Sequence, residues 1–323
     1  MKIAALYLYA YEMSRSGILI HLVDEGQNSS WGEIAPLPKW SMETLKESLL
    51  QLNFKQKKIL EIEWTLLNWS YELKKLNLLP AVSFGLESAI LALLCPLPEY
   101  TILTSALLMG SPQEILNQAV LRRKEGFTSA KLKVGNLALD EAADLIHQLK
   151  DQFYLRIDVN RAWRAKDSLH FFSQFPLDAF DYVEEPFENP NDLNLFTHPL
   201  AVDESFPQDL TFEQLESMPA LKAMIYKPTL QGGMLGCLQL LDWTKKRGLD
   251  LILSSSFESD LGLAYVGSIA HRLSLSEPVG IGTYHFLEDY LCQDSLGFSS
   301  SHVTIPVRLH PILSKCRLLT LYE

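Results

Sequence analysis

The sequence predicts an α/β fold in which a closed (β/α)8 barrel follows a small N-terminal α+β domain. From about residue 100 onward, eight short apolar runs alternate with longer polar segments that have room for helices. Eight such repeats are the number that closes a parallel barrel. Before residue 95 the order differs, because strand patterns come first and helical patterns follow. The length of 323 residues suits about two domains.

The N-terminal part is predicted to form about three strands followed by helices. Aliphatic and aromatic residues gather in three short stretches, at residues 2–10, 16–23 and 31–34. Leu45, Leu49 and Leu52 then recur at helical spacing, and Ser41 is the expected N-cap of that helix. A further helix is expected over residues 83–95.

The proline-rich stretch at residues 95–99 is the predicted boundary between the two domains. We expect an N-terminal domain at 1–98, a barrel at 99–289, and a tail of about 290–323 that packs back on the N-terminal domain. The eight runs of the barrel are TSALLMG (104–110), SAKLKVG (129–135), YLRIDVN (154–160), DYVEEP (181–186), LAVDES (200–205), AMIYKPT (223–229), DLILSSSF (250–257) and PVGIGTY (278–284). A doubly wound open sheet is the structural alternative for this periodicity.

Composition and charge disfavour several classes of protein. The net charge of −11 argues against nucleic acid and anionic membranes as partners, because a phosphate backbone attracts basic faces. No apolar stretch is long enough for a membrane span, and the N-terminus lacks the features of a signal peptide. Four scattered cysteines indicate a reduced, cytoplasmic setting. The expected partner is a small molecule, and a monomer is the expected form.

Charged and hydroxyl side chains end six successive apolar runs of the predicted barrel. They are Lys131 and Lys133, Asp158 and Asn160, Glu184 and Glu185, Asp203 and Glu204, Lys227, and Ser254 to Ser256. The carboxyl ends of barrel strands form the active-site face, and residues i and i+2 point to the same side of a strand. These side chains are therefore expected to meet in one cavity. A solvated strand end explains any one of them, but not opposite charges in register on neighbouring strands.

Three of these carboxylates, Asp158, Glu184 and Asp203, come from adjacent predicted strands, with no histidine or cysteine beside them. Hard oxygen ligands in this number suit Mg²⁺, or Mn²⁺ as a substitute, better than zinc. Without a cation the three carboxylates would repel one another. In each of the two acidic pairs only one member can point inward, so its neighbour is expected to support the site or face the surface.

The lysines around this cluster predict proton abstraction. A lysine acts as a general base only when its pKa is lowered, and burial and nearby positive charge both lower it. Lys131, Lys227 and the metal would supply positive charge around Lys133, with Lys133 and Lys227 roughly opposite across the barrel. The arrangement suits removal of a proton next to a carboxylate, while the metal neutralises the resulting ene-diolate.

The order K-x-K, D-x-N, E-E-P, D-E-S, K-P-x-x-x-G-G resembles the enolase superfamily, in its muconate-lactonizing subgroup. Within it, the chain is similar to the o-succinylbenzoate synthase family of menaquinone biosynthesis. The segments that carry the resemblance span nearly the whole chain: WGEIAPLP (31–38), FGLESAILAL (84–93), SAKLKVG (129–135), LRIDVNRAW (155–163), VEEP (183–186), VDES (202–205), KPTLQGG (227–233) and SSSFESDLG (254–262). The resemblance implies a TIM-like barrel of the modified (β/α)7β type, capped by the N-terminal domain and its segment near residues 12–17.

The resemblance also implies an activity, the Mg²⁺-dependent syn dehydration of 2-succinyl-6-hydroxy-2,4-cyclohexadiene-1-carboxylate to 2-succinylbenzoate, which is a hydro-lyase reaction. Asp158, Glu184 and Asp203 would bind the metal. Lys133 would take the α-proton and return a proton to the departing hydroxyl, and Lys227 would stabilise the ene-diolate from the other face.

Further roles follow from the same resemblance. Lys131 would tune Lys133 and contact the bound carboxylate. The implied substrate contacts are Ser254, Ser256, the backbone at Gly280, Asn160, and Arg156, which should share the face of Asp158.

Three other members of the subgroup would use the same two lysines and metal: N-succinylamino acid racemase, dipeptide epimerase and muconate cycloisomerase. A D-x-D on the eighth strand is typical of the epimerase, and this chain has GIGTYHF (280–286) there. The racemase stays open as the alternative function, because Lys133 and Lys227 are both present. A non-catalytic homologue should have lost part of the catalytic set, and no member is missing. A dinucleotide-binding oxidoreductase is disfavoured because residues 280–285 lack the third glycine of its motif.

The chain departs from the family pattern in two places. The usual E-S-S-x-G is E-S-D-L-G here, so Asp260 replaces a small hydroxyl residue. This aspartate either alters the pocket edge or begins the next helix as an acidic N-terminal residue. The lid segment before Gly17 is short, which would enclose less of the substrate.

Overall fold

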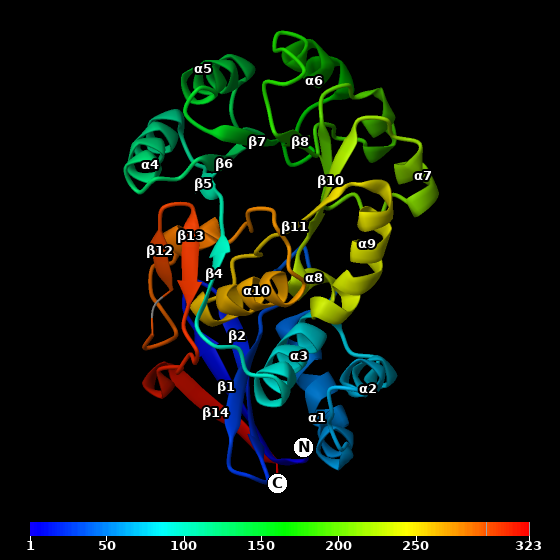
Figure 1. Cartoon of the computed structure of the whole chain (residues 1–323), viewed down its shortest axis with the longest axis vertical. Helices are drawn as coiled ribbons and strands as arrows, with labels where there is room; N and C mark the ends of the chain where they lie inside the picture. Colours follow the sequence, from blue (N-terminus) through cyan, green and yellow to red (C-terminus); the bar gives the residue numbers. More distant parts are fainter. Residues whose placement is uncertain (295, 323) are drawn as a thin grey trace.

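The computed structural model describes residues 1–294 and 296–322, and its strands form three sheets (Figure 1). The N-terminal part is a four-stranded antiparallel sheet with helices packed on it. A seven-stranded parallel sheet curls into a barrel with helices outside it, and a three-stranded sheet lies beside the barrel. This architecture confirms the predicted fold class. No helix in the described part of the chain has the length and apolar content that a membrane span needs.

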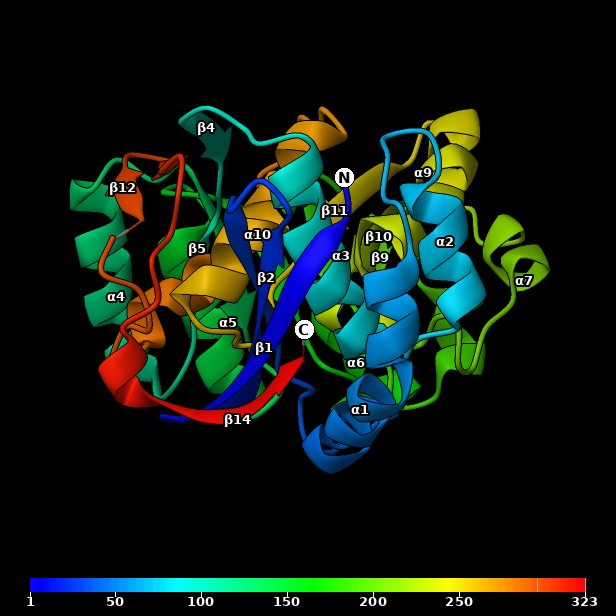
Figure 2. The same ribbon diagram turned by 90° about the horizontal axis from the view of Figure 1, so that it is seen from below.

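The N-terminal sheet packs against helices through one buried apolar cluster. Its strands are β1 (Ile3–Glu12), β2 (Ser16–Asp24), β3 (Ser29–Ile34) and β14 (Cys316–Tyr322), in the order β14-β1-β2-β3. The helices are α1 (Leu45–Glu61), α2 (Trp69–Leu76) and α3 (Pro80–Leu94). Figure 2 shows this sheet and these helices from below, with both chain ends close to them.

Helix α1 is capped by Thr44, so the prediction of Ser41 as its N-cap is wrong. Thr44 Oγ1 accepts from the Glu47 N–H at 3.2 Å, and the Glu47 carboxylate accepts from the Thr44 N–H at 2.8 Å. Such a capping box satisfies two N–H groups that a helix start leaves free. Ser41 instead accepts from the Leu37 N–H at 2.8 Å and closes the preceding turn. The predicted helix at 83–95 begins earlier, at Pro80, where proline suits the first turn.

The barrel strands pair in parallel and in chain order, from β5 to β11. They are β5 (Ala106–Leu108), β6 (Ser129–Lys133), β7 (Tyr154–Asp158), β8 (Tyr182–Glu184), β9 (Leu200–Val202), β10 (Leu221–Tyr226) and β11 (Asp250–Leu253). The helices between and after them are α4 (Pro112–Lys124), α5 (Leu139–Leu149), α6 (Ala165–Phe172), α7 (Phe212–Glu216), α8 (Pro228–Gln231), α9 (Gly233–Arg247) and α10 (Asp260–Arg272). A 3-10 turn at Pro190–Leu195 lies between β8 and β9 in place of a helix.

The eighth strand is reduced to two residues that close the barrel. Val279 bridges Thr104 and Gly280 bridges Ser254, both in parallel orientation. The Gly280 N–H donates to the Leu253 carbonyl at 2.8 Å. A 3-10 turn, Gly282–Phe286, follows directly. The barrel is therefore of the (β/α)7β type.

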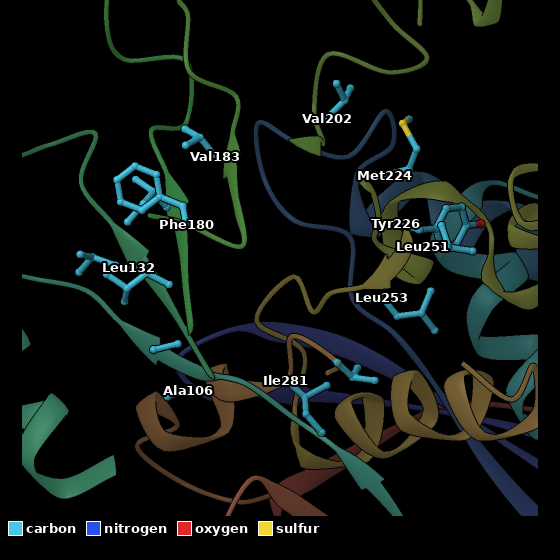
Figure 3. Packing of buried hydrophobic residues seen from close by; sticks show 14 of the residues in the cluster. Ala106, Leu132, Phe180, Val183, Val202, Met224, Tyr226, Leu251, Leu253 and Ile281 are labelled. Carbon is cyan, nitrogen blue, oxygen red and sulfur yellow. The ribbon is translucent and has the colours of Figure 1, made fainter. Parts of the chain in front are cut away.

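Side chains of the barrel strands alternate between the inside and the outside of the barrel. Those inside form a small buried apolar cluster of Tyr182, Ala201, Ala223, Ile225 and Ile252. Those outside pack under the helices, and Figure 3 shows some of them, including Leu132, Val183, Val202, Met224 and Leu253. The residues two positions after the inner cluster continue on the inner face at the strand ends. The apolar cluster thus lies inside the barrel directly beneath the charged strand ends.

The C-terminal segment divides between the two parts of the molecule. Strand β14 pairs with β1 in the N-terminal sheet. Strand β12 (Gly297–Ser299) instead pairs with β13 (His302–Ile305), and β13 pairs with β4 (Tyr100–Leu103) beside the barrel. Only part of the tail from about residue 290 therefore packs on the N-terminal sheet.

A buried carboxylate joins the N-terminal part to the barrel. Glu87 of α3 accepts from the backbone N–H groups of Met234 and Leu235 at the start of α9, the latter at 2.8 Å. The first N–H groups of a helix have no partner within the helix, so Glu87 satisfies two of them. Burial raises the pKa of Glu87 to about 8.

This pKa predicts how stability changes with pH. Between the ordinary carboxyl pKa and about 8, folded Glu87 holds a proton that the unfolded chain has lost. The free energy of unfolding must therefore fall as pH rises through that window, at up to about 1.4 kcal/mol per pH unit for one group. Glu87→Gln removes this titration. We expect the difference in unfolding free energy, wild type minus variant, to decline from pH 5 to pH 8 in urea titrations. A constant difference would contradict the raised pKa.

Candidate active site

Strand register places the charged strand ends side by side. Lys133 pairs with Asp158 across β6 and β7, and Asp158 pairs with Glu184 across β7 and β8. Glu184 pairs with Ala201, so Asp203 continues on the same inner face two residues later. The register thus brings these predicted site residues to one end of the barrel.

Two lysines bind the carboxylates of β7 and β8. Lys131 Nζ lies 2.7 Å from both carboxylate oxygens of Glu184 and 2.9 Å from Asp158 Oδ2. Lys133 Nζ lies 3.3 Å from the same Asp158 oxygen and donates to Asn160 Oδ1 at 2.9 Å. Lys131 therefore links the two carboxylates, and Lys133 stands beside Asp158.

A third lysine follows β10 and faces β9. Lys227 Nζ forms an ion pair with Asp203 Oδ2 and lies 5.8 Å from the ring centroid of Trp40. The Lys227 N–H donates to Gln231 Oε1 at 2.8 Å, which fixes the backbone from which the ammonium extends. Both the ammonium and the backbone of this lysine are therefore held.

The buried charges shift one another's pKa values. Burial favours neutral Asp158, but Lys131 and Lys133 outweigh burial and lower the pKa of Asp158 to about 2. Burial also favours neutral Lys131, but Asp158 and Glu184 keep the pKa of Lys131 well above its ordinary value. Burial and the charge of Asp158 raise the pKa of Glu184 well above its ordinary value. The surroundings therefore disfavour the ionised form of Glu184, and an added cation would stabilise it.

Two residues with left-handed backbone hold the cluster in place. Asn160 (φ +49°) donates its N–H to Asp158 Oδ1 at 3.0 Å and accepts from Lys133. Glu185 (φ +46°) is buried, and its carboxylate accepts from the Asp203 N–H at 2.8 Å. Such backbone is costly for residues with side chains and persists where the surroundings impose it. Glu185 is therefore a supporting residue, as expected for its pair. The same expectation fails for Asp203 and Glu204, because both carboxylates offer an oxygen within 4.8 Å of Glu184.

A cavity of about 140 Å³ lies over the three lysines. The predicted residues that line it are Lys131, Lys133, Asn160, Lys227, Ser254, Ser256 and Gly280. Sequence reasoning missed Leu37, Trp40, Phe257 and Thr283, which also line it. A larger cavity of about 700 Å³ adjoins it, shares Trp40, Asn160, Lys227 and Leu230, and is also lined by Asp203 and Glu204. The N-terminal part contributes Leu37 and Trp40, so the cavity belongs to both parts of the molecule.

Arg156 lies apart from these side chains, although its sequence position suggested a substrate contact. Its guanidinium donates to Asp181 at 2.7 Å, to Glu277 at 3.0 Å and to the Pro278 carbonyl at 2.9 Å. Its centre lies 5.1 Å from the Tyr182 ring centroid. Asp181 and Pro278 lie where β8 and the eighth strand begin, at the opposite end of the barrel. Arg156 therefore lies at the end of the barrel opposite the cavity, and we do not assign it to the cavity.

The two departures from the family pattern have structural explanations. Asp260 begins α10, and its carboxylate accepts from the N–H groups of Leu291 at 2.7 Å and Cys292 at 2.9 Å. Asp260 is not among the residues that line the two cavities, and its carboxylate holds the backbone at Leu291 and Cys292. In the segment near residues 12–17, the Arg15 guanidinium donates to the carbonyls of Ala35 and Ser256. This short segment is therefore attached directly to the cavity wall.

The donor set fits a hard divalent cation. Glu184, Asp203 and Glu204 each offer a carboxylate oxygen within 4.8 Å of the others. Glu204 Oε2 is buried and finds no hydrogen-bond partner among the described residues. The predicted ligand Asp158 is not a member of this group, and Glu204, which was not predicted as a ligand, takes the third place; Lys131 pairs with both Asp158 and Glu184. Oxygen-only donors of this kind suit Mg²⁺ or Mn²⁺.

Two family models match the chain. Residues 6–93 match the family described as MenC, N-terminal domain. Residues 114–309 match the family described as Enolase C-terminal domain-like.

Curated relatives match most of the chain. It is 31% identical over 312 residues to an o-succinylbenzoate synthase from Yersinia enterocolitica, covering 89% of this chain and 92% of that protein. It is 33% identical over 297 residues to an o-succinylbenzoate synthase from Edwardsiella ictaluri, covering 86% and 85%.

Solved structures share the fold at lower identity. The dipeptide epimerase from Cytophaga hutchinsonii, solved with Mg and the dipeptide D-Ala-L-Val, matches with a TM-score of 0.82 at 16% identity and covers 100% of both chains. The muconate lactonizing enzyme from Pseudomonas putida matches with a TM-score of 0.77 at 17% identity, covering 98% of this chain and 97% of that one.

The geometry predicts that Asp203 contributes to metal binding. Asp203→Asn removes one negative charge from the group that offers oxygens to a cation, so we expect the Kd for Mn²⁺ to rise at least about tenfold. Isothermal titration calorimetry measures this directly. Asp242→Asn, at an exposed carboxylate of α9, is the matched control and should leave the titration unchanged. An unchanged titration in Asp203→Asn would remove Asp203 from the ligand set.

Proposed function

Because the chain belongs to the o-succinylbenzoate synthase family of the enolase superfamily, we propose that it dehydrates 2-succinyl-6-hydroxy-2,4-cyclohexadiene-1-carboxylate to 2-succinylbenzoate in menaquinone biosynthesis. The reaction makes the chain a hydro-lyase. One observation supports the proposal above all: Lys131, Lys133 and Lys227 line one cavity and pair there with carboxylates from three adjacent strands. Proton removal next to a carboxylate requires a base and buried positive charge in this arrangement.

We assign Asp158, Glu184 and Asp203 as the ligands of one Mg²⁺ ion. Their oxygen-only chemistry and the raised pKa of Glu184 support this choice, because a cation would keep that carboxylate ionised. When bound, the cation supplies positive charge that favours the doubly negative ene-diolate form of the substrate carboxylate. Asn160 and Glu185 would keep the ligand carboxylates in place through the bonds described above.

Lys133 is the proposed base. Its Nζ borders the cavity and is held by Asn160 Oδ1 at 2.9 Å, so the amine has a fixed position. As a neutral amine it takes the proton from ring carbon 1. As an ammonium it then gives a proton to the hydroxyl that leaves from carbon 6, the ring double bond forms, and water departs. One group on one face performs both transfers, which accounts for a syn elimination.

Lys131 and Lys227 are proposed to remain charged and to stabilise the ene-diolate. Burial lowers their pKa values, but the neighbouring carboxylates outweigh burial and raise both above the ordinary value. Fixed positive charge in a cavity shielded from water is the most effective form of such stabilisation. Ser254, Ser256 and the backbone at Gly280 are proposed to contact the succinyl tail, since all three line the same cavity.

Turnover with and without metal tests the proposed function. The cyclohexadiene substrate is followed by loss of its ultraviolet absorbance, first with Mg²⁺ and then with EDTA. We expect rapid conversion that EDTA abolishes and added Mg²⁺ restores. Folded, metal-loaded protein that leaves the substrate unchanged would contradict the substrate assignment.

Lys133→Ala tests the base. We expect kcat to fall by about 10²–10⁴-fold, the usual contribution of general acid–base catalysis. The Kd for Mn²⁺ and the melting temperature should stay near wild type, because the side chain is partly exposed and is not a proposed ligand. Lys246→Ala, on the exposed side of α9, is the control. Near-normal turnover in Lys133→Ala would show that another group is the base.

Racemisation of N-succinylamino acids is the second candidate function. One observation favours it: Lys133 and Lys227 line the same cavity from β6 and from the end of β10. Two bases on opposite faces are what a racemase needs. Exchange of the α-proton of N-succinylamino acids in deuterated water, followed by NMR, would detect this activity. If no exchange occurs, racemisation is excluded and dehydration is the one proposed activity that remains.

A further inference from the structure

We propose that Glu33, a residue of the N-terminal sheet, is a positioning residue that fixes the cavity wall formed by residues 254–257. Through this wall it determines how tightly the substrate is held. The kinetic part of this inference rests on the proposed function, whereas its structural part does not.

The carboxylate of Glu33 is fully buried and reaches from β3 to the start of α10. Oε1 accepts from the Tyr11 hydroxyl at 2.5 Å and from the Ser259 N–H at 3.0 Å. Oε2 accepts from the Ser259 hydroxyl at 2.6 Å and from the Gly262 N–H at 2.7 Å. Three of these four bonds come from the start of α10. Glu33 therefore satisfies helix N–H groups that would otherwise be buried without partners.

Two glycines leave the room that this carboxylate and its partner need. A Cβ atom at residue 262 would lie 2.6 Å from Glu33 Oε2, and a Cβ atom at residue 17 would lie 2.3 Å from the Tyr11 hydroxyl. Real Cβ atoms do not approach other atoms so closely, so any side chain at Gly262 or Gly17 would displace Glu33 or Tyr11. Gly262 thus permits the close approach of the two parts, and Gly17 makes room for Tyr11 within the N-terminal sheet.

The cavity wall at residues 254–257 needs contacts from other segments to keep its conformation. Ser254, Ser256 and Phe257 line the 140 Å³ cavity, and Phe257 holds a left-handed backbone at φ +60°. A residue with a side chain leaves this conformation unless its surroundings hold it. Two contacts restrain Ser256: its N–H donates to Glu258 at 2.6 Å, and its carbonyl accepts from Arg15.

Glu33 fixes the far end of this short turn. Only Glu258 separates Phe257 from Ser259, which is the N-cap of α10 and is bound by Glu33 twice. A shift of Ser259 would therefore move the wall, although Glu33 itself does not line the cavity. Because the wall lines the cavity together with Lys131 and Lys133 and supplies none of the proposed metal ligands, its displacement should weaken substrate binding more than the chemical step.

Glu33→Gln tests this inference with two readouts. The carboxamide keeps the size of the side chain but faces N–H donors with an amide nitrogen. We expect KM for the cyclohexadiene substrate to rise about tenfold while kcat changes less than about threefold. Hydrogen–deuterium exchange of the peptide over residues 254–262 should speed up by about tenfold or more in the same variant. Ser259→Ala removes one of the four bonds and also the N-cap bond that Ser259 Oγ accepts from the Leu261 N–H, and it should shift both readouts in the same direction.

Glu43→Gln is the matched control. Glu43 is also a buried carboxylate that accepts from a helix N–H, that of Ala81 at 2.7 Å, but its bond stays within the N-terminal part. This variant should lose stability and leave both the KM and the exchange of residues 254–262 at wild-type values.

The outcomes separate the inference from the proposed function. Unchanged KM and unchanged exchange in Glu33→Gln and Ser259→Ala would overturn the role of Glu33. Equal effects in Glu43→Gln would also overturn it, because general destabilisation would then explain the result. A wild-type protein without turnover would contradict the proposed function alone, and the exchange measurement would still decide the role of Glu33.

Discussion

Buried opposite charges at one end of the barrel are the constraint on which the rest of the structure depends. Asp158, Glu184 and Asp203 could not stand together in a low-dielectric interior without positive partners. Lys131, shared between two of them, supplies the central countercharge. Because side chains alternate along a strand, the residues two positions before these charges also face the barrel interior. Tyr182 and Ala201 belong to the buried apolar cluster there, and Arg156 is ion-paired. The proposed base, Lys133, lies beside Asp158 in this network and borders the cavity.

Buried carboxylates also join the two parts of the molecule, by accepting hydrogen bonds from helix N-termini. Helices of the barrel present N–H groups that have no partner inside the helix, and carboxylates of the N-terminal part supply the acceptors. Glu87 does so at α9 and Glu33 does so at α10. These two helices follow the strand ends that carry Lys227 and Ser254. The N-terminal part therefore completes the cavity directly, through Trp40, and supports its walls from behind.

Much of this could be predicted from the sequence because it depends on local pattern. Alternation along each strand was enough to assign Lys133, Asp158 and Glu184 to one face. Arg156 shares that face, but its partners Asp181 and Glu277 come from distant segments that no periodicity relates to it. The contacts made by an acidic side chain are likewise invisible in sequence.

For that reason the partners of Glu33 and Asp260 emerged only from the structure, although both residues lie in recognisable motifs. The N-cap of α1 could have been predicted correctly. Thr44 has Glu47 three residues later, which is the capping-box pattern, whereas Ser41 has no Glu or Gln at that spacing.

A crystal structure with Mn²⁺, located by its anomalous scattering, and bound 2-succinylbenzoate tests the proposed site most directly. We predict Mn²⁺ bound by the aspartates and glutamate of three adjacent strands, with Lys133 and Lys227 on opposite faces of the ring. An ion held by Glu204 in place of Asp158, or a ring beyond the reach of Lys133, would contradict it.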